Sequence, residues 1–186
     1  MLRPVFILLL FALPLAVQAN EKRLNQADFP EQLEIEEQQL VLRNAAVLNY
    51  LFVDVYSAAL LAPPTATLND LVSSEAPLHL ELFYYRNIGR DDVIKAAWVA
   101  LERQYDSAEL EQLRPGIDAL HATFTDISPG DRYGLTLDRE RNLSLQYNGE
   151  EIFQSDDEQL ARAYVGIWLR ENGLSERLRR QLIAER

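Results

Sequence analysis

The stretch NYLFVDVYSAALL, residues 49–61, decides the fold because it is mostly apolar yet carries several polar groups. Its content of Val, Phe and Tyr favours β-structure, and we predict one long strand over residues 50–61. Side chains alternate between the two faces of a strand, and one face then gathers Leu48, Tyr50, Phe52, Asp54 and Tyr56. The polar atoms of this face indicate either the solvent-exposed side of a core strand or the wall of a binding site.

Strand and helix patterns come in blocks along the rest of the chain. β-Rich or alternating stretches predict strands at residues 33–35, 40–47 and 78–85, and a three-strand meander with an Asn148-Gly149 turn at residues 131–154. Helical spacing predicts helices at residues 68–74, 89–105, 106–113, after the capping box at 155–158, and from Ser175, with Pro115 starting a separate segment. Because helices do not follow each strand singly, we predict an α+β fold: an antiparallel sheet covered by helices.

The first nineteen residues, MLRPVFILLLFALPLAVQA, have the three parts of a secretory signal: basic Arg3, an apolar stretch, and small residues before a cleavage point. We predict cleavage after Ala19, a periplasmic or secreted location, and a single domain over residues 20–186. The alternative is an uncleaved membrane anchor, but the apolar stretch is shorter than the roughly 20 residues that span a bilayer. Residues 20–32 are polar, and we expect a loose lead-in.

Composition narrows the function classes. Of 186 residues, 48% are hydrophobic and 25% charged, which is typical of a globular domain. A formal net charge of −11 disfavours binding to nucleic acid, because phosphates would be repelled. The chain has no cysteine, so thiolate metal sites and thiol nucleophiles are excluded. His79 and His121 lack ligand spacing, and no phosphate-binding loop or nucleophile elbow is present, so we expect no metal and no cofactor.

Four motifs follow one another in an order that resembles a known family. They are LVLRNAAVLNYLFVDVYSAALLAP (40–63), GDRYGLTLD (130–138), LQYNGEEI (145–152) and LARAYVGIWLRENGLSERLRRQLI (160–183). Together they resemble the chalcone-isomerase-like proteins, and in particular exported bacterial members. The resemblance implies an open-faced β-sandwich, a large antiparallel sheet with helices layered on it. It also implies a cleft between sheet and helices for a planar phenolic compound or a fatty acid.

The resemblance carries over only part of the family's site. The arginine that holds the anionic group of the ligand corresponds to Leu48, while the tyrosine of the fatty-acid binders corresponds to Tyr56. The catalytic tyrosine and asparagine of the isomerases correspond approximately to Arg90 and Ala97. The resemblance therefore implies no catalytic residues here. The expected ligand-binding residues are Tyr56, Leu48, Tyr50, Phe52 and Arg43, and the candidates to replace the missing arginine are Arg43, Arg86 and Arg90.

Three functions stay open at the level of sequence. The leading hypothesis is an exported, non-catalytic protein that binds a fatty acid or another apolar small molecule near Tyr56. The second is an intramolecular lyase or isomerase that acts on a phenolic enone with Tyr56 as the acid. The third is an interaction module of the cell envelope with an empty cleft.

Overall fold

The structure, a computed structural model, describes residues 13–184. Seven described strands form one antiparallel sheet in chain order: β1 (Gln32–Ile35), β2 (Gln38–Tyr50), β3 (Val53–Ala62), β4 (Leu78–Tyr84), β5 (Arg132–Leu137), β6 (Leu143–Tyr147) and β7 (Glu150–Ser155). The described helices are α1 (Leu13–Ala27), α2 (Leu68–Val72), α3 (Arg90–Gln104), α4 (Ser107–Ala122), α5 (Glu158–Leu169) and α6 (Glu176–Leu182). The predicted α+β architecture, with helices layered on an antiparallel sheet, is confirmed.

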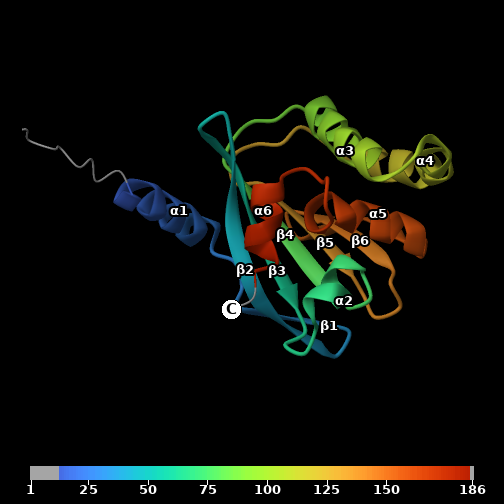
Figure 1. Cartoon of the computed structure of the whole chain (residues 1–186), viewed down its shortest axis with the longest axis horizontal. Coiled ribbons are helices and arrows are strands. Elements are labelled where there is room, and N and C mark those ends of the chain that lie inside the picture. The colour runs from blue at the N-terminus through green and yellow to red at the C-terminus, as the bar shows by residue number, and fades with distance from the viewer. Residues whose placement is uncertain (1–12, 185–186) are drawn as a thin grey trace, which may run out of the picture.

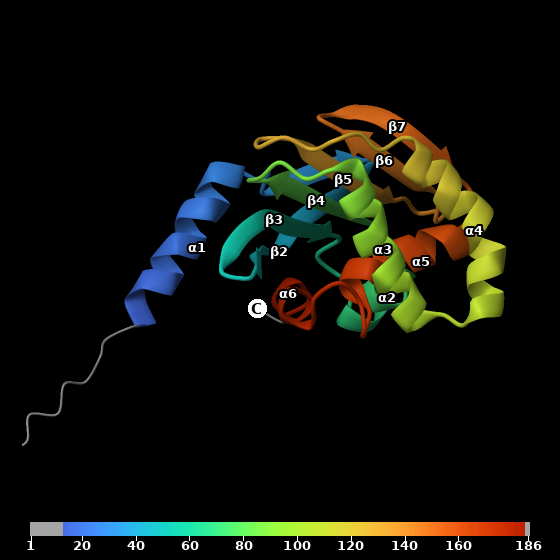
Figure 2. The ribbon, with the colours of Figure 1, turned by 90° about the horizontal axis from the view of Figure 1, so that it is seen from above.

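The two faces of the sheet have different covers (Figures 1 and 2). On the inner face, Leu80, Leu82 and Tyr84 of β4 belong to the main core together with residues of α3, α4 and α5. On the outer face, Phe83 packs in a smaller cluster with Ala27 of α1. This split follows from strand alternation, because successive side chains of β4 point to opposite faces.

The stretch predicted as one strand over residues 50–61 is a hairpin, so that prediction is wrong in its first residues. β2 ends at Tyr50, and Leu51 and Phe52 form a two-residue turn with φ of 46° and 67° before β3 begins at Val53. Positive φ at both central residues is the geometry of the tight hairpin turn that matches strand twist. The sequence hides this turn because Asn and Gly, its usual residues, are absent from it.

A β-bulge at Val55 also corrects the predicted faces of this stretch. In the ladder, Leu48 pairs with Tyr56 but Asn49 pairs with Asp54, so Val55 is the extra residue on β3. Asp54 therefore turns to the outer face, where its carboxylate accepts a hydrogen bond from Arg23 at 2.8 Å. Tyr56 and Leu48 share the inner face because they are cross-strand neighbours.

The segment after the predicted signal is ordered, contrary to the expected loose lead-in. α1 continues to Ala27, which is fully buried against the outer face of the sheet. The predicted cleavage after Ala19 falls within α1, while residues 1–12 lie outside the described part of the chain, so signal cleavage stays a prediction. Within residues 13–184, no helix combines the length and hydropathy needed to cross a bilayer.

Helix α4 runs through Pro115, where the sequence predicted a new segment. Proline removes one helical hydrogen bond and disfavours a helix interior. The apolar face formed by Leu113, Ile117 and Leu120 nevertheless continues across it and is buried. Tertiary packing of this face outweighs the local cost, while the predicted capping box of Asp106 and Glu109 is confirmed at the helix start.

His121 is a buried group whose protonation depends on folding. It is 3% exposed, and its ring lies among those of Trp98, Phe124 and Tyr164. Neither ring nitrogen has a hydrogen-bond partner among the described residues. Burial lowers the pKa of His121 to about 4, so the folded protein keeps the neutral form well below pH 6.

We expect the free energy of unfolding to fall as pH drops from about 6.5, the pKa of an unfolded histidine, to about 4. In the His121→Phe variant, the loss of unfolding free energy at pH 4 should be smaller by up to about 3 kcal/mol, because an apolar ring takes up no proton. Urea unfolding of both proteins at pH 7 and pH 4.5 measures the difference. His79, whose burial also lowers its pKa to about 4, keeps part of the pH dependence in both proteins. Equal pH slopes would contradict the account of His121.

Candidate functional site

A cleft of about 880 Å³ lies between the inner face of the sheet and helices α3 and α5. Its volume is within the range of roughly 300–1,000 Å³ found for small-molecule sites. The sheet contributes mainly aliphatic and aromatic side chains to the cleft: Leu48, Val53, Val55, Tyr56, Leu80, Leu82, Tyr84, Tyr133, Leu135 and Leu145. The helical side contributes Val93, Ala96, Ala97, Val99, Tyr164, Ile167 and Trp168. The interior is therefore suited to an apolar guest.

The space exists because α3 is anchored at both ends and has small residues between them. At its start, Arg90 donates hydrogen bonds to the carbonyls of Phe124 and His121, each at 3.0 Å. Near its end, Gln104 donates to the carbonyl of Gly166 in α5 at 2.9 Å. Ala96 and Ala97 lie between these anchors and line the cleft, so little side-chain volume fills it.

Inside the cleft the polar groups are neutral hydroxyls. Trp168 Nε1 donates a hydrogen bond to the Tyr56 hydroxyl at 3.0 Å, which links α5 to β3. The Tyr56 and Tyr84 rings lie 5.2 Å apart. Burial raises the pKa of both tyrosines above the ordinary value of 10, so both hydroxyls stay protonated and can donate.

The mouth of the cleft carries the charges. Arg86, Lys95 and Arg103 are exposed cations among its lining residues, and Asp92 is an exposed acid there. Lys95 and Arg103 are eight residues apart on α3, with Val99 halfway between them, so the three share one helix face. Cations at the rim of an apolar cleft favour a ligand with an anionic end.

The structure separates the predicted site residues into two groups. Leu48, Tyr50 and Tyr56 line the cleft, whereas Phe52 is fully exposed at the hairpin tip and does not. Arg43 is engaged elsewhere: its guanidinium donates to the carbonyls of Pro63 and Ala66, at 2.9 and 3.0 Å.

Of the other two candidate anion holders, Arg86 lies at the mouth and Arg90 anchors the start of α3. Lys95, Arg103, Tyr84 and Trp168 also line the cleft and were not among the residues expected from the sequence. The spacing of four residues from Lys95 to Val99 to Arg103 was the available signal for the mouth.

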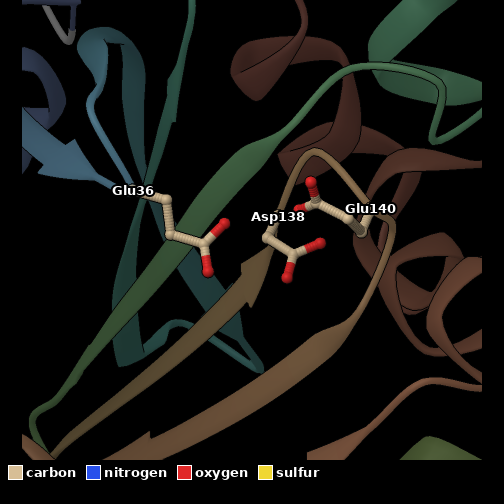
Figure 3. A group of neighbouring side chains, drawn as sticks. All are labelled: Glu36, Asp138 and Glu140. Atoms are coloured by element: carbon tan, nitrogen blue, oxygen red, sulfur yellow. The ribbon is translucent and has the colours of Figure 1, made fainter.

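An acidic cluster occurs away from the cleft. Glu36 of the β1–β2 turn faces Asp138 and Glu140 of the β5–β6 turn (Figure 3), with one carboxylate oxygen of each within 4.8 Å of the others. The negative charge of Asp138 raises the pKa of Glu36. Asp138 also accepts hydrogen bonds from the backbone and side chain of Asn142, both at 2.8 Å, which fixes the turn. Exposed acids that stabilise a turn in this way do not indicate a metal site.

Comparison with known proteins identifies the family. The residue pattern described as chalcone isomerase-like matches residues 21–184. The chain belongs to the chalcone isomerase-like family. A search of curated proteins gave no match. Among solved structures, a fatty-acid binding protein of Arabidopsis thaliana is similar, with a TM-score of 0.64 and 14% sequence identity over 83% of this chain and 90% of that one. At this identity the similarity shows the fold alone.

For this chalcone isomerase-like protein, the pairing of Leu48 with Tyr56 defines the chemistry of the inner wall. A leucine occupies the position expected for an arginine, next to a tyrosine that keeps a protonated hydroxyl. The inner wall can therefore donate a neutral hydrogen bond but supplies no positive charge. Among the described residues that line the cleft, positive charge comes from Arg86, Lys95 and Arg103 at the mouth.

Tyr56→Phe removes the acceptor of the Trp168 indole N–H and should lower the free energy of unfolding by about 1 kcal/mol. Urea unfolding followed by circular dichroism measures this change. The matched control is Tyr50→Phe, because the Tyr50 side chain is 68% exposed, and we expect no change there. Equal stabilities of the Tyr56→Phe variant and the wild type would show that the Tyr56–Trp168 bond does not contribute.

Proposed function

We propose that this protein is a non-catalytic binding protein that holds a fatty acid, or a similar single-chain amphiphile, in the cleft between the sheet and α3. The observation that carries the proposal is an apolar cleft of about 880 Å³ whose cations stand only at its mouth. The fold shared with a plant fatty-acid binding protein supports it. We further propose that residues 1–19 direct export, so that the protein acts in the periplasm or outside the cell.

The placement of charge favours one orientation of the ligand. An ionised carboxylate beside Tyr56 would be buried without a countercharge, which costs several kcal/mol in real proteins. At the mouth, the same carboxylate can pair with an exposed cation such as Lys95 or Arg103 and keeps part of its hydration. The alkyl chain then extends inward over Leu82 and Tyr84, and the carboxylate stays outside.

The site lacks the groups that the isomerase hypothesis needs. Ring closure requires a donor and a nucleophile held in fixed geometry, with charge stabilised as it develops. Arg90, at the approximate position of the catalytic tyrosine, is bound to backbone carbonyls of residues 121 and 124, and Ala97 stands where asparagine is expected. Tyr56 alone offers a weak acid. These observations favour binding without catalysis.

Filling the cleft should weaken binding of the fatty acid. Ala96→Trp places an indole among the lining residues. We expect it to lower the affinity for a fluorescent long-chain fatty acid by about tenfold or more, or about 1.4 kcal/mol. Fluorescence titration measures the affinity, and native mass spectrometry of the gently purified protein shows whether a lipid is retained. Ala122→Trp, at an exposed position of α4 outside the cleft, is the control and should bind like the wild type. Equal binding by both variants would place the ligand elsewhere.

The mouth cations should distinguish head groups. The double variant Lys95→Gln, Arg103→Gln should lower the affinity for a fatty acid by about tenfold, or about 1.4 kcal/mol. Its affinity for the corresponding fatty alcohol should not change. The double variant Lys22→Gln, Arg177→Gln removes the same charge from exposed positions away from the cleft and serves as the control. Competition titrations with both ligands give the four affinities. An equal loss for acid and alcohol would contradict the proposed orientation.

A further inference from the structure

We propose that the β2–β3 hairpin tip, Tyr50–Phe52, docks on an anionic lipid bilayer together with the cations at the cleft mouth. The cleft opening would then face the membrane surface.

The first observation is exposure. Tyr50, Leu51 and Phe52 are 68%, 73% and 105% exposed, so three consecutive large apolar side chains stand in water. Single exposed apolar residues are common on protein surfaces, but a contiguous group marks an interaction site. In Figure 1 the hairpin, drawn in cyan, extends beyond the other strands of the sheet.

The second observation is that the turn itself does not require apolar residues. Within residues 13–184, three hairpin turns have positive φ at two consecutive residues: Glu36-Glu37 (47° and 62°), Leu51-Phe52 (46° and 67°) and Asn148-Gly149 (51° and 86°). The same backbone thus carries a charged pair, an apolar pair and the Asn-Gly pair that this turn prefers. Bulky side chains are disfavoured at positive φ. The apolar pair at the β2–β3 turn therefore breaks two local rules, which is the pattern of a functional position.

The third observation is the setting of the tip. Tyr50 and Leu51 line the mouth of the cleft, where Arg86, Lys95 and Arg103 are exposed. Asp92 is the one acid among those lining residues, and the nearby Asp54 is paired with Arg23 and Asn49. The residues that line the cleft thus include three cations and one acid, in a protein whose net charge is −11.

Aromatic and aliphatic side chains flanked by cations match the interface of an anionic bilayer. Such residues enter the boundary between head groups and acyl chains, while Lys and Arg interact with the negative lipids. A protein partner fits less well, because stable protein interfaces bury about 800 Å² on each side and a three-residue tip offers far less. The observations thus favour a membrane as the occupant.

Vesicle flotation tests the proposal with the exported protein. We expect the fraction of wild-type protein that floats to be at least tenfold larger with vesicles of phosphatidylcholine and phosphatidylglycerol than with pure phosphatidylcholine. Addition of 0.5 M salt should lower the fraction bound to the anionic vesicles. Leu51→Asn with Phe52→Gly installs the Asn-Gly turn of residues 148–149 and should reduce flotation about tenfold. Its melting temperature should equal or exceed that of the wild type, since this pair suits the turn. Equal flotation of the two proteins would overturn the proposal.

Moving the apolar pair to another turn controls for nonspecific hydrophobic binding to vesicles. Adding Glu36→Leu and Glu37→Phe to that double variant moves the apolar pair to the β1–β2 turn, beside acids and away from the cleft. This protein should not regain flotation, and full recovery would overturn the proposal.

A tryptophan probe gives a reading that does not depend on total binding. Lipids brominated in the acyl chain should quench the tryptophan fluorescence of the Phe52→Trp variant more than that of the wild type. The Glu37→Trp variant should show no such additional quenching. Quenching of both or of neither would contradict docking through Tyr50–Phe52. Fatty-acid titration of the wild-type protein without vesicles tests the proposed function separately, so failure of one idea is distinguishable from failure of the other.

Discussion

The register between β2 and β3 is the constraint on which the site depends. Leu48 opposite Tyr56 places both on the inner face, and the bulge at Val55 sends Asp54 to the outer face beside Arg23. A shift of one residue in this ladder would reverse the two faces. Tyr56 would then lose Trp168, and the charge of Asp54 would enter the apolar cleft. The position of Asp54 on the outer face and the cleft on the inner face thus follow from one pairing.

Helix α3 turns this sheet surface into a cleft. Contacts through Arg90 and Gln104 hold its ends against neighbouring elements, while alanines face the floor between them. Its outer positions supply Lys95 and Arg103 to the rim. The result is a gradient from cations at the mouth to neutral hydroxyls inside, which suits a molecule with one charged end and one long apolar end.

The parts of the fold that follow local rules could be predicted from the sequence. Asn148-Gly149 marked the β6–β7 turn, and the capping pair of Asp106 and Glu109 marked the start of α4. The β2–β3 turn could not be predicted in this way, because Leu51 and Phe52 occupy a conformation that bulky residues rarely adopt. The prediction of a new segment at Pro115 was wrong for the opposite reason. Proline disfavours a helix interior, but the packing of the apolar face of α4 outweighs this local effect.

For the site, the sequence indicated Tyr56 and Leu48, but it could not show which of the arginines reach the cleft. A crystal structure of the protein grown with a long-chain fatty acid tests the central claim most directly. We predict the alkyl chain between Tyr84 and Ala97, with its carboxylate within hydrogen-bond distance of Lys95 or Arg103. A cleft without the fatty acid, or a carboxylate placed against Tyr56, would contradict the account.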